Sequence, residues 1–238
     1  MKGLDIITPV KDSIVLSEQT VRAVMASDLP MPFTYTVYDD NSTPENAARL
    51  EELARELGFR LIHIAQYVSH PSPNYLWVLQ QAQQEALACD RALLVVESDV
   101  TVKPETLKTL YEEASARPEC GLMAAVTVDE AEQINYPYEN ARKYAKAMVR
   151  EKGHLSFCCT LLTPAFLQSF DFHALNPAKN WYDVFLSHRA RKNGFVNYLL
   201  TDLTVLHRPH SSRPWKLLKY TCPLKYYWRK YTKGLDKI

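Results

Sequence analysis

The feature of this chain that most constrains its fold is a regular alternation of strand-like and helix-like segments between residues 4 and 128. Apolar or β-branched runs predict strands, and apolar side chains at helical spacing predict the helices between them. The predicted strands are 4–10, 33–38, 60–64, 91–96 and 121–128, and the predicted helices are 13–27, 44–57, 75–88 and 104–117. Such alternation is typical of an α/β domain with a mostly parallel central sheet flanked by helices on both faces. Ligands of such a sheet lie beyond the carboxyl ends of its strands.

The pattern is less regular after residue 128. Residues 129–153 are polar and predict a loop with a helix. The segments predicted after them are a strand at 157–162, helices at 163–169 and 182–193, and a strand at 195–206 that is broken near Thr201-Asp202. We therefore expect one domain over residues 1–210 and a separate tail over residues 211–238.

Length and composition suit one large α/β domain, because the chain has 238 residues and 47% of them are hydrophobic. No stretch approaches the ~18 consecutive apolar residues that span a bilayer. Asp5 stands where a signal peptide would be apolar. The five cysteines form neither a C-x-x-C pair nor a plausible disulfide framework. These observations predict a cytoplasmic protein with reduced thiols.

The net charge of +1 conceals an uneven distribution. From Arg208 to the end, nine Lys or Arg residues and one acid give a net charge of +8, so the other 207 residues carry 19 bases and 26 acids, a net of −7. The tail also holds Trp215, Tyr220, Tyr226, Tyr227, Trp228 and Tyr231. This basic aromatic composition is typical of contact with an anionic membrane surface or of packing on the protein's own domain, and both stay open. A nucleic-acid partner is not expected, because the body is acidic and carries no nucleic-acid-binding motif.

Glu97-Ser98-Asp99 closes the most apolar predicted strand, where charge is costly unless it meets a ligand or a partner. Side chains two residues apart on a strand point to the same side, so both carboxylates can address one divalent cation such as Mn²⁺ or Mg²⁺. A cation of this kind would neutralise a nucleotide diphosphate, for which the chain has no glycine-rich loop. The spacing alone also allows solvated acids or a helix cap.

Four segments, taken in order, resemble motifs of the family 2 glycosyltransferases with the GT-A fold, over about residues 4–210. Ile6-Ile7-Thr8-Pro9-Val10 is similar to the family's first strand, whose end meets the nucleoside. Asp39-Asp40-Asn41-Ser42-Thr43 resembles the turn in which an Asp binds the base. Glu97-Ser98-Asp99 resembles the D-x-D metal motif, and Trp181-Tyr182-Asp183 resembles the motif whose Asp is the catalytic base.

The resemblance implies inverting transfer of a sugar from a nucleotide-diphosphate sugar, a UDP-sugar above all, to a hydroxyl of a glycan or lipid-linked glycan in surface glycan or polysaccharide synthesis. It implies that residues 1–128 form the nucleotide-binding half and residues 129–210 the acceptor and catalytic half. The implied site residues are Thr8, Pro9, Val10, Asp39, Asp40 and Ser98 at the nucleotide, Asp99, Glu97 and His207 at a divalent metal, and Asp183 as the base.

Several of these residues also have a simpler interpretation. His207 follows a predicted strand and could bond only to backbone, and Asp183 begins a predicted helix, where Asp is a common cap. Glu97 and Tyr182 depart from the family's usual Asp and Glu, which keeps a catalytically impaired nucleotide- or glycan-binding relative as an alternative. A sugar nucleotidyltransferase is another alternative, although those enzymes usually carry a glycine-rich loop where this chain has Thr8-Pro9-Val10-Lys11-Asp12.

Overall fold

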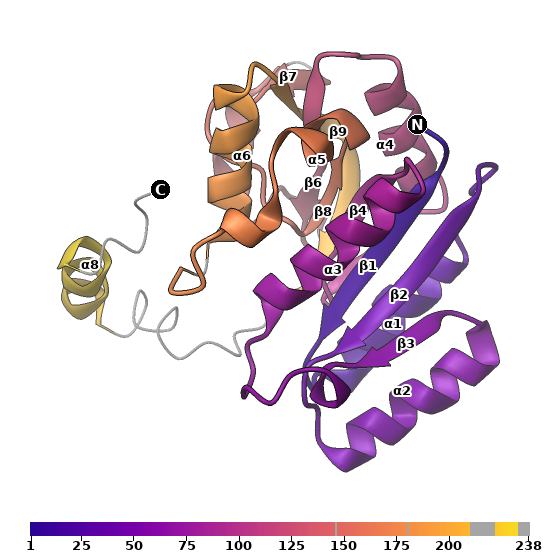
Figure 1. The fold of residues 1–238 in the computed structure, drawn as a ribbon. Helices are drawn as coiled ribbons and strands as arrows, with labels where there is room; N and C mark the ends of the chain where they lie inside the picture. Colours follow the sequence, from indigo (N-terminus) through magenta and orange to yellow (C-terminus); the bar gives the residue numbers. More distant parts are fainter. Residues whose placement is uncertain (146, 180, 210–221, 233–238) are drawn as a thin grey trace.

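The computed structural model describes residues 1–145, 147–179, 181–209 and 222–232. A central sheet of nine strands has the order β3-β2-β1-β4-β8-β6-β9-β5, and β7 pairs with β9 (Figure 1). The strands are β1 (Leu4–Val10), β2 (Phe33–Asp39), β3 (Arg60–His63), β4 (Ala92–Val96), β5 (Val100–Thr101), β6 (Cys120–Val128), β7 (Met148–Arg150), β8 (Cys159–Leu162) and β9 (Val196–His207).

Most strands of the sheet run in the same direction. Strands β1, β2, β3, β4, β6 and β9 run in one direction, and the short strands β5, β7 and β8 run against them. The mostly parallel α/β sheet expected from the sequence is therefore confirmed. Strand β8 lies antiparallel between β4 and β6, so it separates two parallel groups.

Helices cover both faces of the sheet. They are α1 (Ile14–Met25), α2 (Pro44–Leu57), α3 (Tyr75–Ala88), α4 (Thr106–Ser115), α5 (Pro164–Ser169), α6 (Tyr182–Lys192) and α8 (Pro223–Thr232), with the short 3₁₀ helices η1 (Ile64–Gln66), η2 (Glu139–Lys143) and η3 (Phe172–Ala174). One buried apolar cluster joins α1, α2 and α4 to Leu4 and Ile6 of β1, and a second joins α3, α5 and α6 to Ile7. Successive side chains of a strand point to opposite faces, so β1 contributes to both cores.

Local sequence signals place the elements around the strand ends. Helix α2 begins after Thr43, whose hydroxyl accepts a hydrogen bond from the Asn46 N–H at 3.4 Å, and Pro44 is its first residue. It ends at Gly58, whose φ of 82° is readily adopted by glycine. All five residues of β4 are fully buried, as its unbroken apolar run predicts.

The second half of the chain differs in part from expectation. Strand β9 is continuous, and the break expected near Thr201-Asp202 appears only as a register shift, where Ala125 of β6 faces Leu200 and Val126 faces Thr204. The segment 129–153 contains η2 as its helix, but also the short strand β7, which was not predicted. Strand β5 was not predicted either, because two residues carry no detectable periodicity.

The predicted tail over 211–238 falls mostly outside the described residues, which include only 222–232 of it. Helix α8 occupies most of this described part. Across the described residues, no helix combines the length and the hydrophobicity needed to cross a bilayer.

Candidate functional site

The two-residue strand β5 brings the acidic turn to the end of β9. Its Val100 pairs with His207 in antiparallel register, and the Arg208 N–H donates to the Asp99 carbonyl at 3.0 Å. The turn itself is closed by the Val100 N–H, which donates to the Glu97 carbonyl at 3.2 Å. Glu97 and Asp99 therefore lie beside His207, although 108 positions separate Asp99 from His207 in the sequence.

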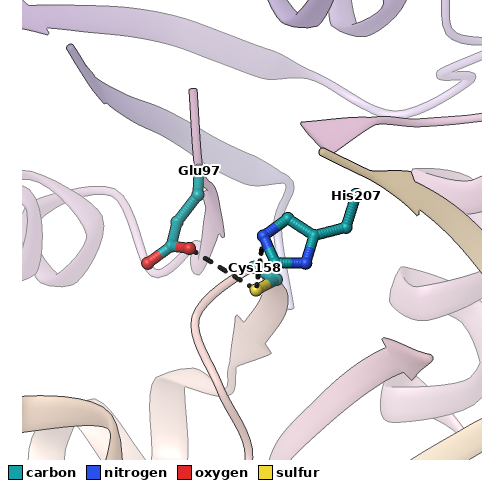
Figure 2. Close-up of side chains that lie close together, drawn as sticks. All are labelled: Glu97, Cys158 and His207. Atoms are coloured by element: carbon teal, nitrogen blue, oxygen red, sulfur yellow. Dashed lines mark hydrogen bonds between the residues drawn. The ribbon is translucent and has the colours of Figure 1, made fainter. Parts of the chain in front are cut away.

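Four side chains from three parts of the fold come together here. Asp99 Oδ2 lies 3.6 Å from His207 Nε2, and the Cys158 thiol lies 3.4 Å from Glu97 Oε2 and 3.9 Å from the same His207 nitrogen. Ligand atoms of Glu97, Cys158 and His207 are all within 4.8 Å of one another. Figure 2 shows Cys158 between the carboxylate and the imidazole. The structure thus brings together the three predicted metal residues and adds a cysteine.

The orientation of His207 is fixed by a backbone carbonyl. Its Nδ1 lies 2.7 Å from the Tyr136 carbonyl oxygen, which can only accept a hydrogen bond, so Nδ1 carries a proton and donates. The other ring nitrogen, Nε2, then faces Asp99 and Cys158. A histidine whose second N–H bonds to a carbonyl is the usual arrangement of a metal ligand. The backbone bond that seemed to be an alternative to metal binding is therefore compatible with it.

Burial and charge set the protonation of this cluster. Burial alone would lower the pKa of His207, but Asp99, Glu97 and the Tyr136 carbonyl outweigh it and raise that pKa above its ordinary value. Burial also raises the pKa of the Cys158 thiol well above its usual range, and Glu97 adds to the effect. The raised pKa of His207 favours the imidazolium, which offsets part of the negative charge of Glu97 and Asp99, and the raised pKa of Cys158 favours the neutral thiol.

The residues present fit a divalent cation. Carboxylate oxygens suit Mg²⁺ and Mn²⁺, and an imidazole nitrogen suits Mn²⁺ and Zn²⁺. Glu97, Asp99 and His207 supply these groups from the carboxyl ends of β4 and β9. The Cys158 sulfur is a softer donor, which favours Zn²⁺ over Mg²⁺.

The Asp39-Asp40 turn has structural partners of its own. The Asp40 carboxylate accepts hydrogen bonds from the Ser72 hydroxyl at 2.7 Å, the Asn74 N–H at 2.8 Å and the Asn74 side-chain amide at 2.7 Å. Asp39 accepts from the Ser42 N–H at 3.1 Å and lies 2.8 Å from His63 Nδ1. Asp39 thus holds the turn and Asp40 holds the start of α3 in place, and their role at a nucleotide stays a prediction.

The other predicted nucleotide residues differ in accessibility. Thr8 is fully buried, and its hydroxyl accepts a hydrogen bond from Tyr35 at 2.9 Å. Val10 is also buried, at the end of β1 beside Asp39, whereas Pro9 is half-buried. Ser98 is buried in the turn between β4 and β5. A nucleotide could therefore meet Pro9 directly, while contact with the Thr8 hydroxyl would need a rearrangement.

Asp183 lies in the first turn of α6, half-buried, and its carboxylate accepts the Val184 N–H at 2.9 Å. Burial raises the pKa of the Tyr138 hydroxyl well above its usual range, and the Asp183 charge adds to the effect. That hydroxyl accepts from the Ser156 N–H at 2.9 Å, and the Ser156 hydroxyl lies 3.4 Å from the Cys158 thiol. Tyr138, Ser156 and Cys158 therefore form a row of polar groups that ends at the acidic turn.

Sequence reasoning missed Cys158 and the carbonyl of Tyr136. The adjacent cysteines Cys158 and Cys159 do not have a spacing that is typical of metal sites. A backbone carbonyl gives no sequence signal at all. Cys158 lies directly before β8, and only the pairing of β8 with β4, the strand that Glu97 follows, brings the thiol to the site.

The fold, with its acidic turn after β4 and its histidine at the end of β9, is that of the GT-A glycosyltransferases. A family model described as "Glycosyl transferase family 2" matches residues 5–171, which is well over half of the chain. The protein therefore belongs to glycosyl transferase family 2. A comparison with curated proteins finds no match.

Solved structures with the same fold are distant in sequence. PcManGT, a mannosyltransferase from Pyrobaculum calidifontis in complex with GDP-Man and Mn²⁺, is 16% identical with a TM-score of 0.64, covering 99% of this chain and 64% of its own. Residues 1–349 of S. aureus TarS, in complex with UDP-GlcNAc, are 17% identical with a TM-score of 0.61, covering 92% and 65%. GalNAc-T7 with UDP, GalNAc and Mn²⁺ is 11% identical with a TM-score of 0.65, covering 89% and 45%. This chain spans less than two thirds of each.

Proposed function

We propose that this protein transfers a sugar from a nucleotide-diphosphate sugar to an acceptor hydroxyl. The observation that carries the proposal is the cluster of Glu97, Asp99 and His207 at the carboxyl ends of β4 and β9, where ligands of such sheets lie. The Asp183 carboxylate, in the first turn of α6, is the general base of this proposal. Family membership supports the reaction class.

The donor would lie across the ends of β1, β2 and β4. Pro9 and the Asp39-Asp40 turn would meet the nucleoside, with Thr8 and Val10 beneath it and Ser98 beside the phosphates. Two of the compared structures hold UDP or UDP-GlcNAc and one holds GDP-Man, so a UDP-sugar is our first choice of donor.

Asp99, with Glu97 and His207, would hold Mn²⁺ or Mg²⁺ against the diphosphate. The cation, when bound, stabilises the negative charge that develops on the leaving phosphate. His207 keeps Nε2 directed at the site because its other nitrogen is bonded to the Tyr136 carbonyl.

Asp183 would remove the proton of the acceptor hydroxyl as its oxygen attacks the anomeric carbon opposite the leaving diphosphate. Attack from that face inverts the anomeric configuration. A carboxylate held in the first turn of a helix is fixed in direction, and here the Val184 N–H contributes to holding it. The assignment of Asp183 follows from its place on α6 and the family motif.

The acceptor that we propose is a glycan or a lipid-linked glycan, in surface glycan or polysaccharide synthesis at the cytoplasmic side of a membrane. A cleft of about 290 Å³ opens between the start of α3 and Tyr182, the neighbour of Asp183. Tyr75 and Trp77 line it together with Tyr182. Aromatic rings present flat apolar faces on which a sugar ring can stack.

The test is a thermal-shift screen of UDP-, GDP- and dTDP-sugars with Mn²⁺ or Mg²⁺, followed by transfer assays with the best donor. We expect one donor to raise the melting temperature only when a cation is present, and the product to have the inverted anomeric configuration by NMR. Absence of binding by any nucleotide sugar would refute the proposal. Donor binding without transfer or hydrolysis would indicate a binding relative, and synthesis of the nucleotide sugar from a sugar phosphate would indicate a nucleotidyltransferase.

A further inference from the structure

Helix α8 exposes an aromatic face to solvent. Leu224, Tyr227, Trp228 and Tyr231 are exposed by 87%, 43%, 66% and 65%. They stand at positions i, i+3, i+4 and i+7, so they form one stripe along a helix of ten residues. We call these four side chains the aromatic face. Exposed large apolar groups gathered in this way mark a binding surface.

The opposite side of α8 faces the rest of the molecule. Tyr226, Arg229 and Lys230 are half-buried, whereas the aromatic face is exposed. The Lys230 ammonium lies 5.7 Å from the centre of the Trp181 ring, a cation–π contact with the segment just before α6. Figure 1 shows α8 at the periphery of the molecule. The helix is thus presented with its aromatic face outward.

The charge of α8 indicates what kind of surface binds the aromatic face. Lys225 and Lys230 lie at the two edges of the stripe and Arg229 lies on the opposite side, and the helix has no acidic residue. The body of the protein is acidic, with a net charge of −7 over its first 207 residues, so it attracts the side of α8 that carries Arg229 and Lys230 and leaves the aromatic face and Lys225 exposed. Anionic lipid headgroups complement Lys225 and the net charge of +8 that the chain carries from Arg208 onward, and tyrosine and tryptophan are the side chains enriched at the boundary between headgroups and acyl chains.

We propose that α8 lies in the plane of an anionic membrane surface, with the aromatic face inserted among the lipids and the exposed Lys225 at the lipid phosphates. A ten-residue helix is about 15 Å long, too short to cross a bilayer but sufficient for an interfacial contact.

This contact would determine which side of the protein faces the membrane. Trp181, which Lys230 contacts, lies two residues before Asp183. The bilayer would therefore lie on the side from which a lipid-linked acceptor reaches the base. This last step rests on the proposed function, whereas binding of α8 to lipid does not.

The experiment is co-sedimentation of the full chain with vesicles of neutral phosphatidylcholine, with or without phosphatidylglycerol. We expect binding to the anionic vesicles only, and at least a tenfold weaker partition for the double variant Trp228→Ala/Tyr231→Ala. Lys225→Ala should weaken the partition about fivefold, because one base near an anionic surface contributes about that factor. Tyr67→Ala, which removes a side chain exposed by 66% elsewhere on the protein, is the matched control and should bind as the unchanged chain does.

Equal binding of the double variant and the unchanged chain would overturn the proposal, as would equal binding to neutral and anionic vesicles. Circular dichroism of each variant checks that its fold is retained. Transfer to a soluble acceptor separates this proposal from the proposed function, because the α8 variants should keep that activity. Loss of vesicle binding with full soluble activity supports the contact, and vesicle binding without any transfer would refute the proposed function alone.

Discussion

A metal bound at the acidic turn would compete with a proton for Nε2 of His207. When no cation is bound, the pKa of His207 is higher in the folded protein than the value of about 6.5 that it has in the unfolded chain. The pairing of His207 with Asp99 therefore stabilises the fold fully at pH values below about 6.5. This stabilisation is lost as the pH rises through the pKa of His207 in the folded protein. A metal requires the neutral ring, so its binding follows the opposite course and strengthens as pH rises.

We therefore expect the rise in melting temperature caused by Mn²⁺ to be larger at pH 8 than at pH 6. The measurement is a thermal-shift titration at several pH values. His207→Gln removes the titrating group and should lose both the metal effect and its pH dependence. An equal Mn²⁺ effect at both pH values in the unchanged chain would exclude His207 from the metal site.

Cys158 should influence which metal binds. Replacing its thiol by a hydroxyl in Cys158→Ser removes the soft donor while keeping nearly the same volume, so affinity for Zn²⁺ should fall by about tenfold or more, close to 1.4 kcal/mol. Affinity for Mn²⁺ should change much less, because Glu97, Asp99 and His207 remain. Isothermal titration calorimetry with both metals measures this, with Cys159→Ser as the control. Parallel losses for the two metals would show that Cys158 is not a ligand.

Asp183→Asn should abolish transfer while leaving donor binding nearly unchanged. The amide keeps the shape of the side chain but cannot accept the proton, and general base catalysis is typically worth ~10²–10⁴-fold in rate. Turnover with a saturating UDP-sugar gives the rate, and calorimetry gives the donor affinity. Asp202→Asn, an exposed carboxylate on β9, is the control. Transfer at more than about a tenth of the normal rate would remove Asp183 from the mechanism.

At the level of single residues, the sequence predicted side chains that stand at recognisable positions next to a strand or helix. It missed the groups whose role depends on which distant segments lie close together. The sequence singled out the acidic turn and His207, which the structure brings together, and Asp183, whose role stays a prediction, because each follows a strand or begins a helix in a recognisable order. The thiol of Cys158 and the carbonyl of Tyr136 depend on pairing between distant segments, which a single sequence does not encode in any local pattern.

Among elements, the connection between the end of β2 and the start of α3 depends on one carboxylate. Asp40→Ala would leave the Ser72 hydroxyl and two Asn74 donors without their acceptor, at a cost of about 3 kcal/mol. In a chain of this size that corresponds to a melting temperature lower by about 10 °C. Thermal unfolding followed by circular dichroism tests this, with Asp202→Ala as the control. A drop no larger than that of the control would show that the connection is held by other contacts.

Elements with a strong period or clear caps were predictable, and the shortest ones were not. Helix α2 has both a cap and a terminal glycine, and its bounds agree with expectation. Strand β5 has two residues, yet its pairing with β9 is what brings the acidic turn to His207. The element that assembles the candidate site is therefore the one with the weakest sequence signal.

For the whole molecule, strand order decides whether the two halves can fold separately. The sequence divides at residue 128, but β8 from the second half lies between β4 and β6 of the first, and β9 lies between β6 and β5. A fragment of residues 1–128 would leave β4 and β6 without the strand that pairs with both. The division into a nucleotide half and an acceptor half is thus one of proposed roles within a single shared sheet.

We expect the full chain to unfold in one cooperative transition and the fragment 1–128 to show none, because cooperativity requires the strands that join the two groups. A chain ending at residue 210 should keep the transition within about 3 °C, because it retains every strand and loses only α8 among the described elements. Scanning calorimetry, with NMR amide dispersion for the fragment, makes the comparison. A cooperative transition in residues 1–128 alone would mean that β4 and β6 can pair without β8, and the sheet would then be less interdependent than its strand order implies.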